Sequence, residues 1–342
     1  MPQASAAALA AFSNSVLCAA GADAASAEAA TRAMSHASLH GIDSHGFRLL
    51  PFYAECLQVG LAKGKPNLTT RPLRRATVLV DADGGLGHLA TYRAMEAACV
   101  LARESGVGLA LVTNSTHFGA AGAYALAAAE AGYIGFVTSN SGALVIPHGG
   151  TKPLHGTNPI ALAAPDPGAG GEPFLLDMAT SSIPWNKVLK YRSEKIDLPS
   201  FVAVDADGAF VIEANSATAL APVGGPEFGY KGAGLAGLAD VLGGVLTGMR
   251  LSFEQDGRAL GDTGLGHFVL AVDPALLMTI EVFGLRLRSY LHSFKSQPGT
   301  YAAGGIEWER KREREASGIP LSDALAGELR ATGGSLGVTA PF

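Results

Sequence analysis

Apolar residues recur at helical spacing over roughly the first sixty residues of the chain. The first predicted helix carries a stripe of four such side chains, Leu9, Phe12, Val16 and Leu17. Gly21 follows and can supply a left-handed stop. A second helix is predicted from a cap at Asp23 to about His40, and a third ends at Gly60. The segment 63–72 contains two prolines and few large apolar side chains, which predicts a linker.

The pattern changes at about residue 76, where short apolar or β-branched runs begin to alternate with helical patterns. The predicted strands are 77–80, 107–112, 134–138, 160–164, 174–177, 201–204 and 267–273. Helices are predicted over 88–105 and 120–131, after Pro274 to about Phe294, and in the charge-rich tail from Glu307. That tail mixes positively and negatively charged side chains, which indicates a helix face exposed to solvent.

This order predicts an α/β (α+β) protein with two domains, since a chain of 342 residues exceeds the usual length of one domain, about 150 residues. We expect residues 1–70 and 285–342 to form a helical domain, in which the C-terminal part packs on the N-terminal part. Residues 71–284 would form the α/β domain.

Composition narrows the class of protein. Hydrophobic residues make up 48% of the chain and mean hydropathy is +0.24, enough for a large core. The net charge of −5 argues against a nucleic-acid partner, and no apolar stretch predicts a membrane span. Three scattered cysteines, Cys18, Cys56 and Cys99, predict neither disulfides nor a metal site and indicate a reducing compartment. Because the N-terminus has no basic segment, we expect no signal peptide and a cytoplasmic location.

The first segment with candidate chemistry is HGIDSHGFR, residues 40–48. Its two glycines bracket a carboxylate, a hydroxyl and an imidazole. His45 can exchange a proton near neutral pH, and either Ser44 or Asp43 can fix its tautomer. Arg48 can hold a substrate carboxylate as a bidentate pair. The alternative is a polar helix-capping turn, which spacing alone favours.

Two further segments follow predicted strands. Residues 113–119 precede a helix and carry His117, a second acid/base candidate, although Asn114 or Ser115 can equally make this an ordinary helix cap. Small polar residues and glycines then cluster at 138–141, 147–150 and 155–159. Such segments can wrap a polar ligand through backbone N–H groups, but ordinary loops have the same composition.

Residues 232–237 match the pattern GxGxxG. A Rossmann fingerprint requires a strand immediately before it, and the preceding residues 226–231 do not form a strand pattern. We interpret these glycines as close helix packing. Lys231 is predicted at the start of that helix, where it can meet a phosphate or carboxylate or simply be exposed. The chain has neither a GxSxG elbow nor a Walker A motif.

Taken together, these segments resemble the malate/L-lactate dehydrogenase family, type 2, which includes sulfolactate, ureidoglycolate and diketogulonate oxidoreductases and cyclic-imine reductases. The matching stretches occur in the family's order between about residues 30 and 315. They are HGIDSHG (40–46), NSTHFG (114–119), PHGGTKPLHGTNPIALAAP (147–165), LLDMATS (175–181), VDADG (204–208), GYKGAGLAGLADVLGGVLTG (229–248), GHFVLAVDP (266–274) and GGIEWERKRER (304–314).

The resemblance implies an NAD(P)-dependent oxidoreductase that interconverts a small 2-hydroxy acid and its 2-oxo acid, with NAD or NADP as cofactor. It also implies a cofactor domain without the Rossmann fold, built on a largely antiparallel sheet. The family forms homodimers whose active site lies between domains and subunits. Two alternatives stay open: reduction of a cyclic imino acid such as pyrroline or piperideine carboxylate, and a catalytically inactive relative that binds nucleotide.

When the family's residue roles are placed on the matching motifs, the resemblance implies that His45 donates the proton to the substrate oxygen and that Ser44 is its relay. His117 would be the second active-site histidine and a cofactor contact. Implied substrate contacts are Arg48, Thr157 and Asn158. Implied cofactor contacts are Ser139, Asp177, Met178, Ala179, Lys231, Gly232, Gly304 and Gly305.

The chain departs from the family pattern at two places. Many members carry the substrate arginine where this chain has Leu49, so Arg48 stands one residue early. After MATS, residues 184–187 read PWNK, and Lys187 replaces an acidic relay residue of imine reductases. The lysine argues against imine reduction, and Trp185 is similar to ureidoglycolate dehydrogenases.

Overall fold

The computed structural model describes residues 3–168, 171–255 and 263–342. The helices of these parts are α1 Ala6–Ala19, α2 Ala24–Leu39, α3 Leu50–Gln58, α4 Gly87–Ser105, α5 Gly122–Glu130, α6 Trp185–Glu194, α7 Gly225–Ala239, α8 Ile280–Lys295, α9 Gly305–Ser317 and α10 Asp323–Ser335. The strands are β1 Gln3–Ala4, β2 Thr69–Arg74, β3 Thr77–Asp81, β4 Val107–Thr116, β5 Ile134–Ser139, β6 Ile160–Ala164, β7 Phe174–Met178, β8 Ala203–Val204, β9 Ala219–Leu220, β10 Thr263–Val272 and β11 Ile319–Pro320.

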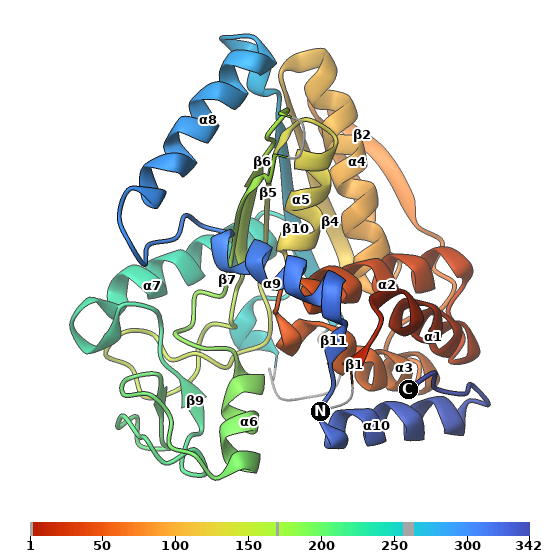
Figure 1. The fold of residues 1–342 in the computed structure, drawn as a ribbon, viewed down its shortest axis with the longest axis vertical. Coiled ribbons are helices and arrows are strands. Elements are labelled where there is room, and N and C mark those ends of the chain that lie inside the picture. The colour runs from red at the N-terminus through yellow and green to blue at the C-terminus, as the bar shows by residue number, and fades with distance from the viewer. Residues whose placement is uncertain (1–2, 169–170, 256–262) are drawn as a thin grey trace.

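A seven-stranded sheet forms the centre of the molecule (Figure 1), in the order β2-β3-β4-β10-β5-β6-β7. Among the described residues of this sheet, only the β3–β4 pair is parallel, and every other neighbouring pair is antiparallel. The mixed α/β class and the largely antiparallel sheet expected from the family resemblance are therefore confirmed.

The late strand β10 lies between β4 and β5 and runs antiparallel to both. Consequently β4 and β5 run in the same direction, and their last residues reach the same end of the sheet. His267 of β10 stands opposite Ser139 of β5. This topology brings the segment after β4, which carries His117, next to the end of β5.

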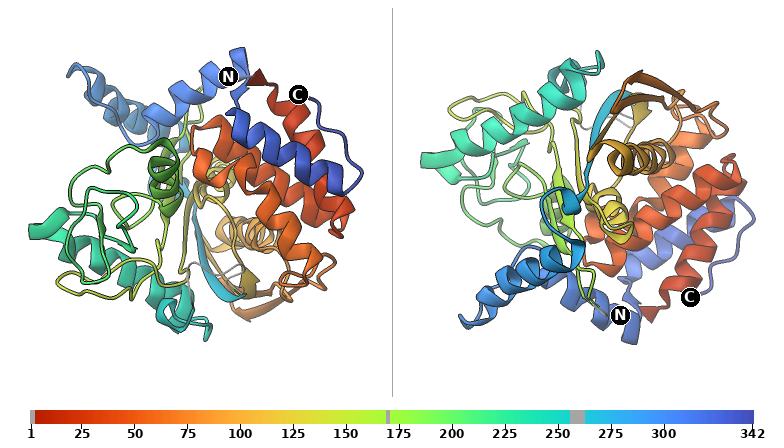
Figure 2. Two further views of the ribbon diagram at one scale, coloured as in Figure 1. Left: turned by 90° about the horizontal axis from the view of Figure 1, so that it is seen from below. Right: turned by 90° about the horizontal axis from the view of Figure 1, so that it is seen from above.

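Helices cover one face of the sheet in two layers. Helices α4 and α5 pack directly on the strands, and α2 packs against α4. Behind them α1, α2, α3 and α10 share a second core (Figure 2) that includes Leu9, Phe12, Tyr53 and Leu329. The short strands β1 and β11 pair antiparallel and join the N-terminal segment to the connection between α9 and α10. The predicted packing of the C-terminal part on the N-terminal part is confirmed for α9 and α10, which contact α1, α2 and α3. It is wrong for α8, which lies apart from these helices (Figure 1). The division into two domains stays a prediction.

The segment with α6 and α7 lies on the other side of the sheet (Figure 2). Residues 232–237 are inside α7, so this GxGxxG pattern forms no strand-to-helix turn. A Cβ added to Gly232 would stand 2.2 Å from the Val223 carbonyl oxygen, which confirms close packing as the role of this glycine. The same interpretation is wrong for Gly234 and Gly237, because a Cβ added at either position would meet no atom within 4 Å. The helix begins at Gly225 with Pro226 in its first turn. Our prediction that Lys231 starts the helix is therefore wrong, because Pro226 favours an earlier start.

Several boundaries differ from the sequence-based predictions. Part of the expected linker is the edge strand β2, whose residues are all exposed and so lack an apolar face that could reveal a strand. Pro274 opens a short 3-10 helix, and α8 starts later, after an N-cap at Thr279. The predicted strand 201–204 is reduced to β8, and α6 had no predicted counterpart. None of the helices in the described ranges is both long and apolar enough to span a membrane.

Candidate active site

The turn between α2 and α3 presents the first group of candidate residues. Gly41 adopts a φ of +80°, where a left-handed backbone favours glycine. Gly46 sits so close to α2 that an added Cβ would lie 2.1 Å from Ser38 Oγ. That hydroxyl accepts a 3.0 Å hydrogen bond from the Phe47 backbone N–H. The two glycines of the motif therefore let the chain fold tightly over α2 and present the 3-10 helix Asp43–His45.

Ser44 and His45 are paired within this 3-10 helix. Ser44 Oγ lies 2.8 Å from His45 Nδ1. Of the two partners considered for His45, the serine is therefore the one in contact, because the Asp43 carboxylate turns away to Arg314. Burial lowers the pKa of His45 to about 4, so the imidazole is neutral at pH 7.

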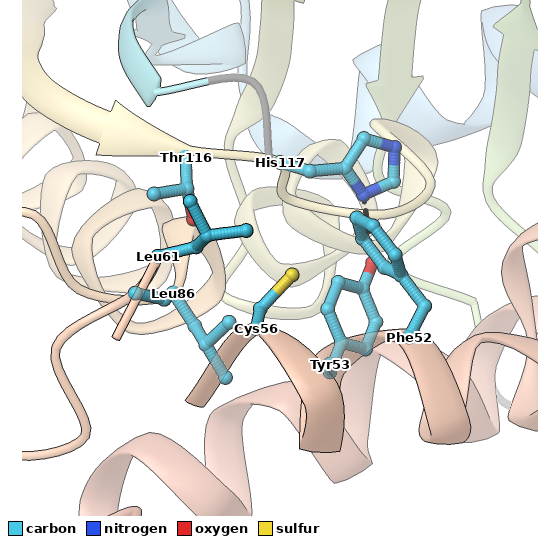
Figure 3. A pocket seen from close by; sticks show the side chains of 8 residues that line it. Phe52, Tyr53, Cys56, Leu61, Leu86, Thr116 and His117 are labelled. Carbon is cyan, nitrogen blue, oxygen red and sulfur yellow. Dashed lines mark hydrogen bonds between the residues drawn. The ribbon is translucent and has the colours of Figure 1, made fainter. Parts of the chain in front are cut away.

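His117 follows β4 and lies beside His45 in the fold. The two imidazole rings stack with their centroids 5.8 Å apart and an interplanar angle of 18°. The Nδ1 atom of His117 is 2.8 Å from the Tyr53 hydroxyl of α3 (Figure 3). Burial, followed by the neighbouring histidines His45, His88 and His267, holds the pKa of His117 well below its usual value. The two predicted histidines therefore meet as neutral rings.

A buried polar group supports the strand ends beneath these rings. His267 Nδ1 lies 2.7 Å from Ser139 Oγ, and its Nε2 lies 2.7 Å from Ser115 Oγ. The ring of Phe118 stacks on His267, with the ring centroids 4.6 Å apart. Burial lowers the pKa of His267 to about 3, so this side chain bridges β4 and β5 as a neutral group.

A cavity of about 220 Å³ opens in front of the two stacked histidines. It is lined by eight of the residues singled out from the sequence: Ser44, His45, His117, Ser139, Thr157, Asp177, Met178 and Ala179. Five segments of the chain that are far apart in sequence supply these side chains. A second, apolar cavity of only about 10 Å³ lies behind His117, on its α3 side (Figure 3).

Asn158 lies outside the cavity lining although its neighbour Thr157 is part of it. Its side-chain amide donates to the Ala236 carbonyl at 2.9 Å and to Asp240 Oδ2 at 3.0 Å. Its Oδ1 accepts from the Ser141 backbone N–H at 3.0 Å. Asn158 is thus engaged in holding the loop against α7, in a positive-φ conformation (+39°). The geometry gives it a supporting position behind Thr157, and its substrate contact stays a prediction.

Other predicted residues also lie away from the cavity. Arg48 is exposed on the 3-10 helix that follows His45, and Lys231 is exposed on α7, with Nζ 5.3 Å from the Phe228 ring centroid. Gly304, with a φ of +90°, begins α9 against Leu175 of β7, and Gly305 follows it. The predicted contacts of these residues and of Gly232 with substrate or cofactor stay predictions.

Two residues of the cavity wall, Asp177 and Asn140, carry acceptor groups of the kind that bind the carboxamide of a nicotinamide. Asp177 Oδ2 and Asn140 Oδ1 are buried without a hydrogen-bond partner among the described residues. Burial raises the pKa of Asp177 to about 6. Unpaired buried acceptors are costly, and a carboxamide N–H is a donor that satisfies them. Apolar side chains such as Met178, Phe118 and Leu265 supply flat walls beside these acceptors. The residues present therefore fit this cofactor.

Three residues of this region were not singled out by sequence reasoning. Tyr53 recurs at helical spacing with Cys56 and Leu57, a pattern that is typical of a core position. Arg314 belongs to the charged tail but reaches back to Asp43, with Nη2 3.0 Å from Oδ2. Asn186 Nδ2 donates to the Ser44 carbonyl at 3.0 Å and joins α6 to the turn. Local patterns carry no signal for these contacts, since each joins segments that are distant along the chain.

Comparisons with known proteins identify the family of this chain. The family described as malate/L-lactate dehydrogenase matches residues 4–330. A malate dehydrogenase of Pyrococcus horikoshii is 37% identical over 266 residues, which are 76% of this chain and 73% of that protein. The ureidoglycolate dehydrogenase (NAD(+)) of Escherichia coli K12 is 32% identical over 90% of this chain and 89% of its own. A (2R)-3-sulfolactate dehydrogenase (NADP(+)) of Chromohalobacter salexigens is 32% identical over 89% of this chain and 90% of its own.

Solved structures give the same result for the fold. The Pyrococcus horikoshii malate dehydrogenase superimposes with a TM-score of 0.88 at 30% identity, covering 99% of this chain and 97% of that one. The Δ1-piperideine-2-carboxylate reductase of Pseudomonas syringae superimposes with a TM-score of 0.87 at 29% identity, covering 97% of this chain and all of that one (100%).

The chain belongs to the malate/L-lactate dehydrogenase family. The sequence-based predictions of an NAD(P)-dependent oxidoreductase of hydroxy acids, and of NAD or NADP as its cofactor, are confirmed at the level of this family.

Proposed function

We propose that the cavity in front of His45 and His117 interconverts a small 2-hydroxy acid and its 2-oxo acid. The observation that carries this proposal is the convergence of Ser44, His45 and His117 on one cavity, whose wall also includes Asp177 and Asn140. NAD(P) supplies a hydride acceptor or donor for the C2 carbon when bound. The protein must then supply the proton transfer at the neighbouring oxygen.

His45 is the proposed proton-transfer residue. As a neutral imidazole it can accept the hydroxyl proton while a hydroxy acid is oxidised, and it returns that proton to the oxygen in the reverse direction. Ser44 holds Nδ1 at 2.8 Å and so fixes the orientation of the ring. Without a positioned acid the substrate oxygen would have to become an alkoxide, and general acid catalysis contributes roughly 10²–10⁴ in rate.

The cofactor is proposed to lie along the wall made by Ser139, Asp177, Met178 and Ala179. We further propose a binding mode without a Rossmann motif, supported by the antiparallel sheet and by the location of the GxGxxG pattern inside α7. The remaining cofactor contacts proposed from the family motifs are Lys231, Gly232, Gly304 and Gly305.

Arg48 and Thr157 are proposed to bind the substrate carboxylate. Thr157 lines the cavity, and Arg48 stands three residues after His45 with an exposed side chain. Asn158 is proposed to act by holding the Thr157 loop, as its internal hydrogen bonds support.

We also propose that the protein is a homodimer. The outer faces of α7, of the π-helical turn Asp240–Val245 and of α8 expose large apolar side chains, which commonly mark an interface. Val245 is 61% exposed on this face, and Val59 is equally exposed at the end of α3. Light scattering should show that Val245→Glu dissociates the dimer while Val59→Glu does not. A monomeric parent protein would overturn this proposal. The cytoplasmic location is proposed from the free cysteines.

The main test is a panel of 2-oxo acids with NADH and with NADPH, scored by the loss of nicotinamide absorbance, together with the reverse oxidation of the 2-hydroxy acids. Turnover of at least one acid, lost in His45→Gln, is the expected result. Cofactor binding without turnover of any substrate would favour the inactive nucleotide-binding relative.

A second candidate function rests on one structural comparison, the TM-score of 0.87 with the Δ1-piperideine-2-carboxylate reductase. Cyclic imino acids therefore belong in the same panel. The 2-oxo acid remains the first proposal because Lys187, exposed on α6, occupies the position that is an acidic relay residue in the pattern of the imine reductases.

A further inference from the structure

The Nδ1 atom of His117 faces two hydrogen-bond donors. The Tyr53 hydroxyl lies 2.8 Å from it, and the Gly119 backbone N–H donates to it at 3.3 Å. A backbone N–H can only donate, so Nδ1 must carry a lone pair. In a neutral imidazole the proton is then on Nε2. This assigns the tautomer of His117 from its partners.

Within the described residues, His117 is the hydrogen-bond partner of the Tyr53 hydroxyl. The side chain is fully buried, and its ring packs edge-on against His88 with centroids 4.6 Å apart. The small cavity beside it is lined mainly by apolar groups, including Phe52, Leu61 and Leu86 (Figure 3). Its volume of about 10 Å³ is at most that of one water, which would find few polar partners there. The hydroxyl is therefore directed at His117.

The phenol also stays a donor throughout the working pH range. Burial raises the pKa of Tyr53 well above its usual value, so the O–H keeps its proton. The titratable groups that face His117 from the packed elements are His45 on the 3-10 helix, Tyr53 and Cys56 on α3, His88 on α4, Asp177 on β7 and His267 on β10. Most are neutral at pH 7, and three of the histidines oppose a positive charge on His117.

We propose that Tyr53 is a positioning residue that, together with the Gly119 backbone N–H, fixes His117 as the Nε2–H tautomer, with this N–H directed into the substrate cavity as a hydrogen-bond donor. Figure 3 shows the second ring nitrogen turned away from Tyr53. His117 then binds and polarises the substrate oxygen, while His45 alone exchanges the proton. This division of labour rests on the proposed function and deepens it, because it gives each histidine one task.

The tautomer is tested directly by ¹⁵N NMR of protein labelled at histidine, with His117→Gln used to assign the signal. We expect a pyridine-like shift at Nδ1 and a pyrrole-like shift at Nε2, unchanged between pH 8 and pH 6. In Tyr53→Phe, which keeps the ring and its packing, the Nδ1 signal should lose its hydrogen-bond shift. A protonated Nδ1 in the parent protein, or an unchanged spectrum in Tyr53→Phe, would overturn the proposal.

Kinetics provide the second readout. Tyr53→Phe should lower kcat about tenfold, the usual scale of one hydrogen bond, with the KM for the cofactor unchanged. Losing the donor destabilises the neutral His117 ring, so the ¹⁵N signals of His117 should titrate at a higher pH in Tyr53→Phe than in the parent protein. Tyr92→Phe is the matched control, since Tyr92 is a buried tyrosine on α4 that packs against Tyr124 and does not line either cavity. An equal kcat and an equal titration of His117 in the parent protein and in Tyr53→Phe would refute the positioning role.

The proposed function and the role of Tyr53 can fail separately. If no substrate of the panel is turned over, the proposed function fails, while the NMR experiment still decides the tautomer. If turnover is found but His117 carries its proton on Nδ1, the proposed function stands and the role of Tyr53 is overturned.

Discussion

Arg314 of α9 forms an ion pair with Asp43, the residue immediately before the Ser44–His45 pair. Both terminal nitrogens of the guanidinium contact the carboxylate, and Nη1 also donates to the Ser38 carbonyl of α2. The arginine side chain is only 12% exposed. Helix α9 therefore clamps the turn that carries the proposed proton-transfer residue.

Removing this clamp should affect both stability and rate. Arg314→Ala is expected to lower the free energy of unfolding by about 1–3 kcal/mol, because hydrogen bonds to a charged group are lost. It should also lower kcat several-fold while leaving cofactor affinity unchanged. Arg312→Ala is the control, since its ion pair with Glu172 is exposed and worth at most about 1 kcal/mol. An unchanged kcat in a destabilised Arg314→Ala would show that the clamp is only structural.

Replacing His45 should remove activity without unfolding the protein. His45→Gln is expected to reduce kcat by roughly 10²–10⁴, the contribution of a positioned acid or base. Urea unfolding should show little loss of stability, because the hydrogen bond between the His45 ring and Ser44 joins adjacent residues of one turn and not distant elements. His292→Gln, an exposed position on α8, serves as the control. Near-normal turnover in His45→Gln would remove this residue from the mechanism.

The two directions of the reaction should differ in pH dependence. The pKa of His45 is about 4, so the neutral base needed for oxidation is almost fully present above about pH 5. For oxidation kcat/KM should be flat from pH 5 to pH 8. Reduction needs the protonated ring, whose population falls tenfold per pH unit above the pKa, and kcat/KM should fall accordingly. A midpoint near 6.5 in the oxidation profile would mean that His45 titrates as it does in water.

Arg48 can be tested by its effect on substrate binding. If it holds the carboxylate, Arg48→Ala should raise the KM for the 2-oxo acid by at least about tenfold, the scale of a charged hydrogen bond, with little change for the cofactor. Arg71→Ala, exposed on the edge strand β2, is the matched control. An unchanged KM in Arg48→Ala would leave Thr157 as the proposed carboxylate contact.

His88 should make the protein sensitive to acid. Within the described residues neither of its ring nitrogens has a hydrogen-bond partner, and burial lowers its pKa to about 3. The unfolded chain binds a proton at about pH 6.5 and the folded chain does not, so stability is lost as pH falls below about 6.5. The loss is at most about 1.4 kcal/mol per pH unit for each such histidine.

His88→Leu should therefore flatten the dependence of the unfolding free energy on pH between about 6.5 and 4. Denaturant unfolding at several pH values measures this slope, and His292→Gln should leave it unchanged. An equal slope in His88→Leu and in the parent would mean that other groups cause the acid sensitivity.

Much of the fold and of the candidate site was predictable where the signal is local. The helical stripe of α1 and the apolar runs of β5 and β6 appear where their periodicity places them. The HGIDSHG and NSTHFG segments identified Ser44, His45 and His117 as candidates, since the first is a turn bracketed by glycines and the second follows a strand pattern and precedes a helix pattern. The strand β2 was not predictable, because an exposed edge strand has no buried face to create a pattern.

By itself, the sequence determined which turns carry polar chemistry and, through its motifs, the family to which the chain belongs. Only the tertiary structure decided that Ser44 rather than Asp43 contacts His45, that Arg314 holds Asp43, and that Tyr53 meets His117 across 64 positions of the chain. Local periodicity reports which side of an element is buried. It does not report which distant side chain lies opposite, because that depends on how the sheet and the helical layer pack together.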